Sequence, residues 1–481
     1  MIKKAIAATF FVAGLACTAI AQDAKTVIGT ASKAMGADNL KTVEYSATGH
    51  DFTLGQAYNP SSPWPKFIEK SYTRAINFET PASRVDRIRN QGENPPRGGG
   101  QQPVIGDQTQ NQTIVVNANT PWVQQLEIWM TPHGFLRAAT TNNATVTTQS
   151  KGGKKYNVVT FMGQNKAKVN GYINDQNMVE KVETWIDNPM LGDTLFEASY
   201  SDYKDFSGIK FPTHIVQTQG GYPIFDLTVN NVKPNAAVNI QNPQRGAAPA
   251  APAAPAQAAP SQKLADGVYL ILGGYASVAI DFKDYIVVIE GPQNEDRASA
   301  IIAETKKLIP NKPIKVVVNT HHHFDHAGGL RTFVAEGATV VTHQVNKPYY
   351  EKLFAAPHTL SPDKQAAAKK KPIFETMTEK KVLTDGNHVI ELHHLQGSGH
   401  NEGLIVAYLP KEKILVEADA FNPPAQPVTQ TPATLSPYNQ NLVANIERLK
   451  LTVETIIPIH YPADGRKVSI AELMKVVGKG N

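Results

Sequence analysis

A histidine-rich run in the second half of the chain carries the residue types of a metal site. Residues 320–326 read Thr-His-His-His-Phe-Asp-His, which contains the spacing His-x-His-x-Asp-His. Alternate residues of an extended segment point the same way, so His321 and His323 can share one metal ion. Asp325 and His326 then reach a second position close by. Imidazole and carboxylate groups together suit a borderline divalent cation such as zinc, so the run predicts a metal-binding loop.

Three isolated residues farther along the chain extend this ligand set. His400 lies in a glycine-rich turn just before an apolar segment, and glycine lets a backbone turn tightly beside an ion. Asp419 and His460 each follow an apolar segment, at residues 413–418 and 455–459. Each of the three, taken singly, is most often a structural cap or a loop hydrogen-bonding group. Their recurrence after the histidine run instead favours two neighbouring metal ions.

The elements predicted around the run are those of an α/β domain. Apolar strands are expected at residues 266–272, 285–290 and 314–318, and the periodicity of residues 297–308 indicates a helix. This order of strand, strand, helix and strand is typical of α/β folds and places the run at the end of a strand. A sheet covered by helices holds side chains rigidly at its strand ends, as metal catalysis requires.

The region from about Leu264 to beyond His460 resembles the metallo-β-lactamase superfamily, through these motifs and through an opening strand of sequence Asp-Gly-Val-Tyr-Leu-Ile. The resemblance implies an α/β fold, an αβ/βα four-layer sandwich with a dinuclear site in the groove between its two sheets. It also implies that one metal is bound by His321, His323 and His400, the other by Asp325, His326 and His460, with Asp419 bridging both. This ligand set leaves coordination positions on both ions for water.

The chemistry expected of such a site is hydrolysis by a metal-bound hydroxide. Two zinc ions ~3.5–4 Å apart lower the pKa of a shared water and polarise the bond under attack. Asp325 is also a candidate catalytic residue, which would orient the hydroxide or pass a proton to the leaving group. Iron or manganese stays open as the metal, because ligand type does not fix metal identity. His322 lies between two ligands and points away, so we expect it to support them rather than bind metal.

Differences between this chain and individual branches of the superfamily restrict the range of possible substrates. β-Lactamases with a cysteine ligand are excluded, because this chain offers only Asp419 where they carry the thiolate. With a bridging aspartate, the chain resembles lactonases, thioester hydrolases and phosphodiesterases. We therefore predict cleavage of an ester, lactone or amide bond, including that of a β-lactam, in a small-molecule substrate. A phosphodiesterase and a non-enzymatic envelope or lipid-binding protein are the alternatives. The insertion at residues 346–384 is either a substrate lid or a solvated helix pair.

The start of the chain is typical of a secretory signal peptide, predicted at residues 1–21. Lys3 and Lys4 precede an apolar stretch, and Ala19-Ile20-Ala21 matches a small-x-small cleavage site. The apolar stretch is shorter than the ~20 residues that span a membrane, so no stable membrane span is expected after cleavage. The sole cysteine, Cys17, lies in the removed segment. The mature protein is therefore predicted to be periplasmic or secreted and to contain no disulfide.

The remaining chain is expected to form two domains. Residues 22–245 are predicted to be a mostly antiparallel β domain of unknown role, in which strands near residues 198–215 resemble the half-barrel of bacterial lipoprotein-carrier proteins. A stretch rich in Gly, Gln, Asn and Pro at residues 90–119 is expected to be a long loop. An Ala/Pro linker at residues 246–262 joins this domain to the predicted hydrolase domain at residues 263–481.

The net charge of the chain argues against a nucleic-acid partner. The chain has 481 residues, 41% of them hydrophobic, so it can bury more than one core. Its formal charge of +5 falls to +3 when the two lysines of the signal segment are removed (5 − 2). A charge this weak does not imply nucleic acid as a partner. No oligomeric state is predicted.

Overall fold

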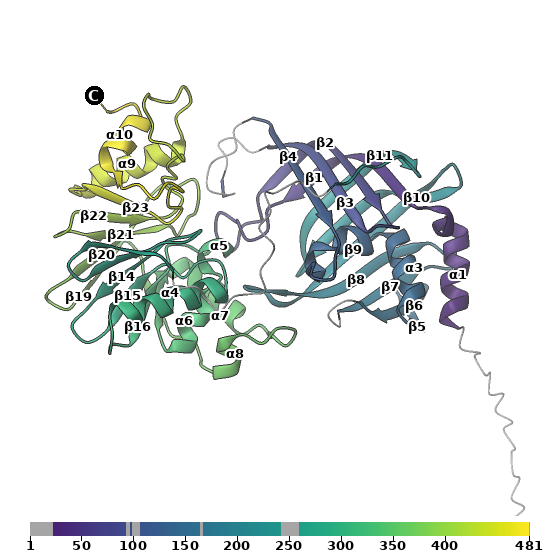
Figure 1. Ribbon diagram of the computed structural model, residues 1–481, viewed down its shortest axis with the longest axis horizontal. Coiled ribbons are helices and arrows are strands. Elements are labelled where there is room, and N and C mark those ends of the chain that lie inside the picture. The colour runs from purple at the N-terminus through teal and green to yellow at the C-terminus, as the bar shows by residue number, and fades with distance from the viewer. Residues whose placement is uncertain (1–22, 93–96, 99–105, 164–166, 242–258, 481) are drawn as a thin grey trace, which may run out of the picture.

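The computed structural model of the protein shows two domains beside each other (Figure 1). It describes residues 23–92, 97–98, 106–163, 167–241 and 259–480. The predicted signal peptide and most of the predicted linker lie outside the described residues. Among the residues that are described, no helix is long and apolar enough to cross a membrane.

The N-terminal domain is built on one large antiparallel sheet, as the sequence predicts for this half of the chain. Its eleven strands follow the order β4-β3-β2-β1-β11-β10-β9-β8-β7-β6-β5. They are β1 (Thr42–Phe52), β2 (Lys66–Asn77), β3 (Ala82–Gln91), β4 (Gln108–Val115), β5 (Thr145–Lys151), β6 (Lys154–Met162), β7 (Lys168–Ile173), β8 (Val179–Asn188), β9 (Gly192–Phe206), β10 (Ile209–Gln219) and β11 (Tyr222–Pro234). The helical segments are α1 (Ala24–Met35), η1 (Ala37–Asn39), η2 (Trp122–Gln124), α2 (Leu126–Trp129) and α3 (Pro132–Thr141).

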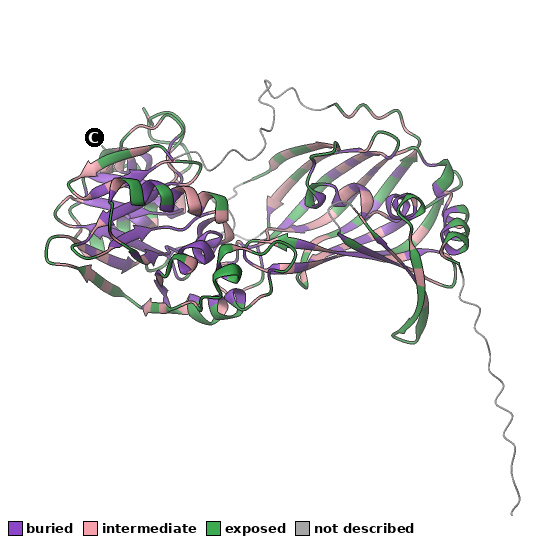
Figure 2. Cartoon of the chain, turned by 60° about the horizontal axis from the view of Figure 1, so that its bottom comes forward, coloured by how far each residue is buried: buried purple, intermediate pink, exposed green. Residues whose placement is uncertain are grey.

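Helices α1 and α3 contact each other and the sheet, which curves in Figure 1. Val27, Ile28, Ala31 and Met35 form the buried stripe of α1, at the spacing that puts side chains on one helical face. Alternate residues of the strands are buried beneath the helices, so that buried and exposed bands alternate along this sheet in Figure 2. This domain therefore has its own hydrophobic core.

Part of the stretch at residues 90–119 is not the loop expected from its composition. Strand β4 pairs with β3 at the edge of the sheet, with Gln108 opposite Arg89 and Val115 opposite Ala82. The side chains of β4 are exposed or half-buried, so this strand lacks the apolar alternation that marks a strand in a sequence. The expectation of a long loop was wrong for residues 108–115, because hydrogen bonding to β3, and not burial of apolar side chains, stabilises this strand.

The C-terminal domain stacks two sheets between outer helices, which confirms the predicted αβ/βα sandwich. The seven-stranded sheet has β12 (Ser261–Ala265), β13 (Val268–Ile271), β14 (Ser277–Asp281), β15 (Ile286–Ile289), β16 (Ile314–Val318), β17 (Thr339–His343) and β18 (Phe374–Met377) in sequence order. The six-stranded sheet has β19 (Lys380–Thr384), β20 (Val389–His394), β21 (Ile405–Leu409), β22 (Ile414–Glu417), β23 (Thr455–Pro458) and β24 (Val468–Ser469). The helical segments are α4 (Glu295–Leu308), α5 (Phe324–Ala327), α6 (Leu330–Glu336), η4 (Gln344–Asn346), α7 (Lys347–Phe354), α8 (Lys364–Ala368), α9 (Pro437–Leu449) and α10 (Ile470–Val476).

Successive residues of the strands pack alternately in the inner and outer apolar layers of this sandwich. Val318 of β16 packs between the sheets with Val416 of β22, whereas Val317 faces the helices of the outer layer. Helices α4 and α6 cover the seven-stranded sheet, and α9 and α10 cover the six-stranded one. Burial on both faces explains why these strands are continuous apolar runs in the sequence.

Two segments join the C-terminal fold more closely than the sequence indicates. Strand β12 begins at Ser261, two residues before the predicted start of the domain at 263, and it pairs with β13. The insertion at residues 346–384 contributes β18 to the first sheet and β19 to the second. Tyr350 of α7 is fully buried. The insertion therefore supplies an edge strand to each sheet of the sandwich in addition to helices α7 and α8.

The turn between β8 and β9 of the N-terminal domain packs against the C-terminal domain. Met190 of this turn packs into the outer apolar layer of the sandwich. The carboxylate of Asp193 accepts hydrogen bonds from the backbone N–H groups of Thr359 and Leu360, all at 2.9 Å. The two domains are therefore in direct contact through this turn.

Candidate metal centre

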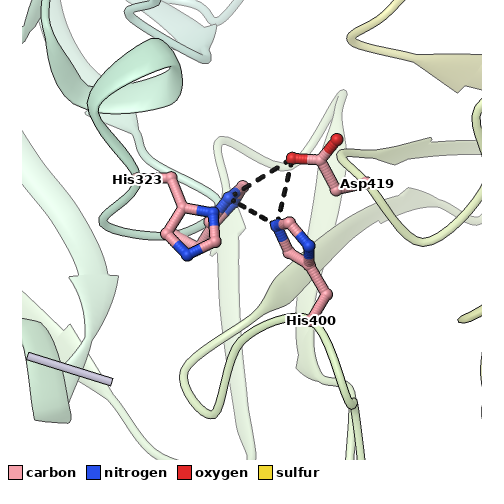
Figure 3. A group of neighbouring side chains, drawn as sticks. His323, His400 and Asp419 are labelled. Carbon is pink, nitrogen blue, oxygen red and sulfur yellow. Dashed lines mark hydrogen bonds and ion pairs between the residues drawn. The ribbon is translucent and has the colours of Figure 1, made fainter. Parts of the chain in front are cut away.

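The seven predicted ligands come from distant parts of the chain and lie together. Their donor atoms form two groups, and within each group they are no more than 4.8 Å apart. The groups are His321, His323, His400 and Asp419, and Asp325, His326, Asp419 and His460. Figure 3 shows the side chains of His323, His400 and Asp419 converging. The structure therefore places every predicted ligand in the group that the family resemblance implies.

Strand ends and short turns position these side chains. The histidine run follows β16, and the one-turn helix α5 turns Asp325 and His326 back toward it. His400 lies in the turn between β20 and β21. Asp419 follows β22 and His460 follows β23, and these strands are parallel neighbours, so their ends meet at one edge of the sheet.

The carboxylate of Asp419 faces both groups at once. Its Oδ2 atom lies 2.9 Å from Nε2 of His326, 3.2 Å from Nε2 of His400 and 3.4 Å from Nε2 of His321. Its Oδ1 atom lies 3.0 Å from Nε2 of His460. One side chain thus contacts ligands of both groups, which is the geometry of a bridge.

The donor set fits divalent metal ions. The Nε2 atoms of His321 and His400 are 3.1 Å apart, and those of His326 and His460 are 3.2 Å apart. Nitrogens at the usual zinc distance of ~2.0–2.1 Å sit on the corners of a tetrahedron with edges of about 3.3 Å, so these spacings suit one ion in each group. Nδ1 of His323 is buried and has no hydrogen-bond partner among the described residues, which leaves a lone pair for a metal.

The electrostatics of the first group favour neutral imidazoles. Burial, together with the neighbouring histidines, holds the pKa values of His321 and His323 well below the ordinary value. Burial opposes protonation of His326 as well, but Asp419 and Asp325 together outweigh it and raise the pKa of His326 well above the ordinary value. Burial opposes the charge of Asp419, yet the surrounding histidines hold its pKa well below the usual range. Neutral imidazole and ionised carboxylate are the forms that bind metals.

A buried carboxylate that the sequence reading missed supports the second group. Glu290 is fully buried at the end of β15 and lies 3.3 Å from Nδ1 of His326, on the ring nitrogen opposite the cluster. It accepts a hydrogen bond from Nδ2 of Asn319 at 3.0 Å and another from the hydroxyl of Thr320. Carboxylates in this position fix the orientation and tautomer of a ligating histidine. An acidic residue directly after the apolar run 286–289 was the available signal.

Two of the acidic residues occupy strained backbone conformations. Asp419 has φ +59° and Glu290 has φ +75°, although neither is glycine. Non-glycine residues in this region cost of order 1 kcal/mol each, and such strain concentrates at functional sites.

Glu417, two residues before Asp419, is buried, and burial raises the pKa of its carboxyl to about 8. Its side chain accepts hydrogen bonds from the backbone N–H groups of Ala420 and Phe421, which hold the turn that presents Asp419.

His322 belongs to neither group, in line with its predicted supporting role. Its Nδ1 atom lies 3.0 Å from Nδ2 of Asn401, the residue next to His400. Burial lowers the pKa of His322 to about 3, so the imidazole is neutral. His322 and Asn401 therefore connect the histidine run to the turn that carries His400.

Both carboxylate oxygens of Asp325 are held by residues that the sequence reading missed. The hydroxyl of Tyr275 donates to Oδ2 at 2.9 Å, and its ring packs on His460 with ring centres 4.3 Å apart. The side-chain amide of Gln56, from the N-terminal domain, donates to Oδ1 at 2.7 Å. Gln56 precedes Asp325 by 269 residues, and no local pattern links the two.

Comparisons with known proteins find a family match in the C-terminal domain. Residues 277–460 match the family model of the metallo-beta-lactamase superfamily. The linear primary-alkylsulfatase of a Pseudomonas strain is 35% identical over 57 residues, which cover 12% of this chain and 11% of that protein. The chain thus spans about a tenth of the length of this curated relative.

Two solved structures match part of this chain. A metallo-beta-lactamase from Pontibacter korlensis has a TM-score of 0.34 and 18% identity, covering 46% of this chain and 98% of that one. A stereoselective inverting sec-alkylsulfatase from Pseudomonas sp. has a TM-score of 0.31 and 19% identity, covering 42% of this chain and 38% of that one. The family match confirms the predicted family for the C-terminal domain: residues 277–460 belong to the metallo-β-lactamase superfamily.

Proposed function

We propose that this protein is a dinuclear zinc hydrolase that cleaves an ester, lactone or amide bond of a small molecule. The observation that carries the proposal is the position of Asp419, whose two carboxylate oxygens face the two histidine groups at 2.9–3.4 Å. A carboxylate shared in this way suits two ions rather than one. Two divalent ions bound there would supply a Lewis acid and would make water a nucleophile near neutral pH.

The residues of the chain then have separate tasks. His321, His323 and His400 would hold one ion, and His326 and His460 would hold the other with Asp325. Tyr275 and Gln56 fix both oxygens of Asp325, so this carboxylate is oriented before substrate arrives. We assign it a second role as the group that receives or passes on a proton during hydrolysis. Burial and the neighbouring histidines hold the pKa values of His321 and His323 well below the ordinary value, which keeps these two imidazoles neutral.

A substrate panel combined with metal analysis tests this function. We expect two zinc ions per chain and hydrolysis of at least one member of a panel of carboxylate esters, lactones, β-lactams and amides. A phosphate diester and an alkyl sulfate ester complete the panel, the latter because the curated relative is named an alkylsulfatase. Chelation should abolish turnover and zinc should restore it. Turnover that survives complete removal of metal contradicts the proposal.

Matched variants separate the site from general effects of mutation. His321→Ala and Asp419→Ala should reduce turnover to background, because each removes a buried ligand. His214→Ala is the control, since this half-exposed histidine pairs with Asp226 in the N-terminal domain. It should retain both zinc and turnover. An equal loss of turnover in all three variants would indicate a general folding defect and would contradict a specific role of the metal ligands.

We also propose that the protein is exported and loses its first 21 residues. The support is sequence alone: the lysines at positions 3 and 4, the apolar stretch and the small residues before Gln22. Expression in a bacterium, followed by cell fractionation and N-terminal sequencing, checks this. We expect a periplasmic or secreted chain that begins at Gln22. A cytosolic chain that keeps Met1 contradicts export and leaves the proposed chemistry intact.

A further inference from the structure

We infer that the loop between β1 and β2 of the N-terminal domain, residues 53–65, is a positioning element of the metal centre. This inference rests on the proposed function and gives a role to a domain that has none so far. The loop reaches across the domain boundary and contacts His323, Asp325 and the turn that carries His400. Without it, two of the seven proposed ligands lose hydrogen-bond partners that lie within 3 Å.

The first contact fixes the tautomer of His323. Its Nε2 atom lies 2.8 Å from the backbone carbonyl oxygen of Ala57, an acceptor only, so this nitrogen carries the proton. The lone pair of the ring is then on Nδ1, the buried nitrogen without a hydrogen-bond partner among the described residues. In metal sites, a backbone carbonyl on the second ring nitrogen sets which nitrogen binds the ion. Here that carbonyl comes from the N-terminal domain.

The second contact orients Asp325. The amide of Gln56 donates to Oδ1 at 2.7 Å, which leaves Oδ2 as the oxygen nearer to Nε2 of His326, at 3.5 Å. Gln56 is uncharged, so it directs the carboxylate without neutralising it. We therefore assign Gln56 as a positioning residue that acts through Asp325.

A glycine lets the loop approach this closely. The carbonyl of Gly55 accepts a hydrogen bond from the backbone N–H of Phe324 at 3.2 Å. A Cβ atom on Gly55 would lie 2.3 Å from the ring of Phe324, and Gly55 has φ +76°. Trp64, at the other end of the loop, meets the same ring edge to face with centres 6.5 Å apart. The loop therefore packs directly on the residue between His323 and Asp325.

The third contact reaches the turn of His400. The carbonyl of Tyr58 accepts from the backbone N–H of Glu402 at 2.8 Å, and Asn59 donates to the Glu402 carboxylate at 2.6 Å. The loop thus forms hydrogen bonds with two segments that carry the first ligand group, the histidine run and the turn of His400. Docking of the domains does not depend on this loop alone, because Asp193 binds Thr359 and Leu360 elsewhere. A change in the loop can therefore disturb the metal centre while the domains stay together.

Gly55→Ala in the full-length chain tests the inference, with Gly208→Ala as the matched control. Both glycines have positive φ, +76° and +83°, so alanine strains both backbones alike, but a Cβ on Gly208 meets nothing within 4 Å. The readout is zinc affinity, from competition with a chromogenic chelator in the absence of substrate. We expect Gly55→Ala to bind zinc roughly 10–100-fold more weakly than wild type, as when supporting groups of other metal sites are lost. Gly208→Ala should match wild type.

Gln56→Ala provides a second measurement if Gly55→Ala fails to fold. It removes the bond to Asp325 but keeps the Ala57 carbonyl, so we expect two zinc ions per chain, a lower kcat and an altered pH profile. Gln56→Asn is shorter and should not restore kcat. Wild-type zinc affinity in Gly55→Ala, or a wild-type kcat and pH profile in Gln56→Ala, would show a mere domain contact and overturn the inference while leaving the proposed function standing. A wild-type chain that binds no zinc overturns both.

Discussion

His326 lies between two carboxylates, with Asp419 2.9 Å from Nε2 and Glu290 3.3 Å from Nδ1. The ring is therefore fixed through both of its nitrogens. Asp419 belongs to the proposed ligand set, whereas Glu290 is fully buried behind it. A buried charge with this many partners is costly to place in a fold, and its position behind a ligand accounts for it.

Glu290→Gln should weaken metal binding without removing a ligand. Glutamine no longer offers a charged acceptor to Nδ1 of His326, so we expect zinc affinity to fall roughly 10–100-fold. Chelator competition measures this. Glu447→Gln is the control, because Glu447 is a surface residue paired with Lys479. Equal zinc affinity in wild type and Glu290→Gln would contradict the supporting role of Glu290.

Metal removal should lower the thermal stability of the chain. A ligand that binds only the folded state at about 1,000 times its Kd adds roughly 4 kcal/mol, which corresponds to a Tm shift on the order of 10 °C for a domain of this size. Thermal unfolding with and without chelator measures the difference. Asp419→Asn, which lacks the shared carboxylate charge, should show a much smaller shift. The same chelator shift in both proteins would argue against the bridge.

Tyr275→Phe should reduce kcat more than it changes KM. The substitution keeps the ring that packs on His460 but removes the hydroxyl that donates to Asp325 at 2.9 Å. Losing one such positioning bond typically costs about tenfold or more in the catalysed step. Steady-state kinetics on the substrate found by the panel provide the measurement. Tyr285→Phe is the control, because Tyr285 is partly buried against the core between the sheets and packs on Phe282. An unchanged kcat would exclude a positioning role for Tyr275.

The N-terminal domain should lose stability in mild acid through His133. This histidine is buried against Phe211, and burial lowers its pKa to about 4 from an ordinary value of 6.5. The unfolded chain therefore binds a proton below pH 6.5 that the folded chain refuses. The contribution is fully present above pH 6.5 and is lost as the pH falls toward 4, by about 3 kcal/mol in total.

His133→Phe removes this proton linkage and keeps a ring against Phe211. We expect the free energy of unfolding of the variant to vary less between pH 6.5 and 4 than that of wild type. Denaturant unfolding at a series of pH values checks this. His214→Ala, which changes a half-exposed histidine of the same domain, should leave the wild-type pH dependence intact.

The grouping of these seven side chains could be predicted because each of them carries a local signal. His321, His323 and His326 share one motif, and Asp419 and His460 directly follow apolar strands. Strands that are buried on both faces give continuous apolar runs, so their ends are easy to locate in a sequence. The α/β sandwich could be predicted for the same reason, since its inner and outer layers both exclude water.

The rest of the site had no such signal. Gln56 and Ala57 reach the centre only because the two domains pack together, and Ala57 contributes a backbone carbonyl that any residue type would supply. Strand β4 is polar on both faces, so its composition indicated a loop. Contacts that depend on tertiary packing, or on the main chain alone, leave no pattern in a single sequence.

The separation of 269 positions between Gln56 and Asp325 has a consequence for how the centre is assembled during translation. The β1–β2 loop leaves the ribosome long before the histidine run, and domains generally fold in the order of synthesis. A nascent chain that has reached Asp325 already has its positioning loop but still lacks His400, Asp419 and His460. The centre is complete only after His460 has been synthesised, so a product terminated before His460 keeps the histidine run without a complete site.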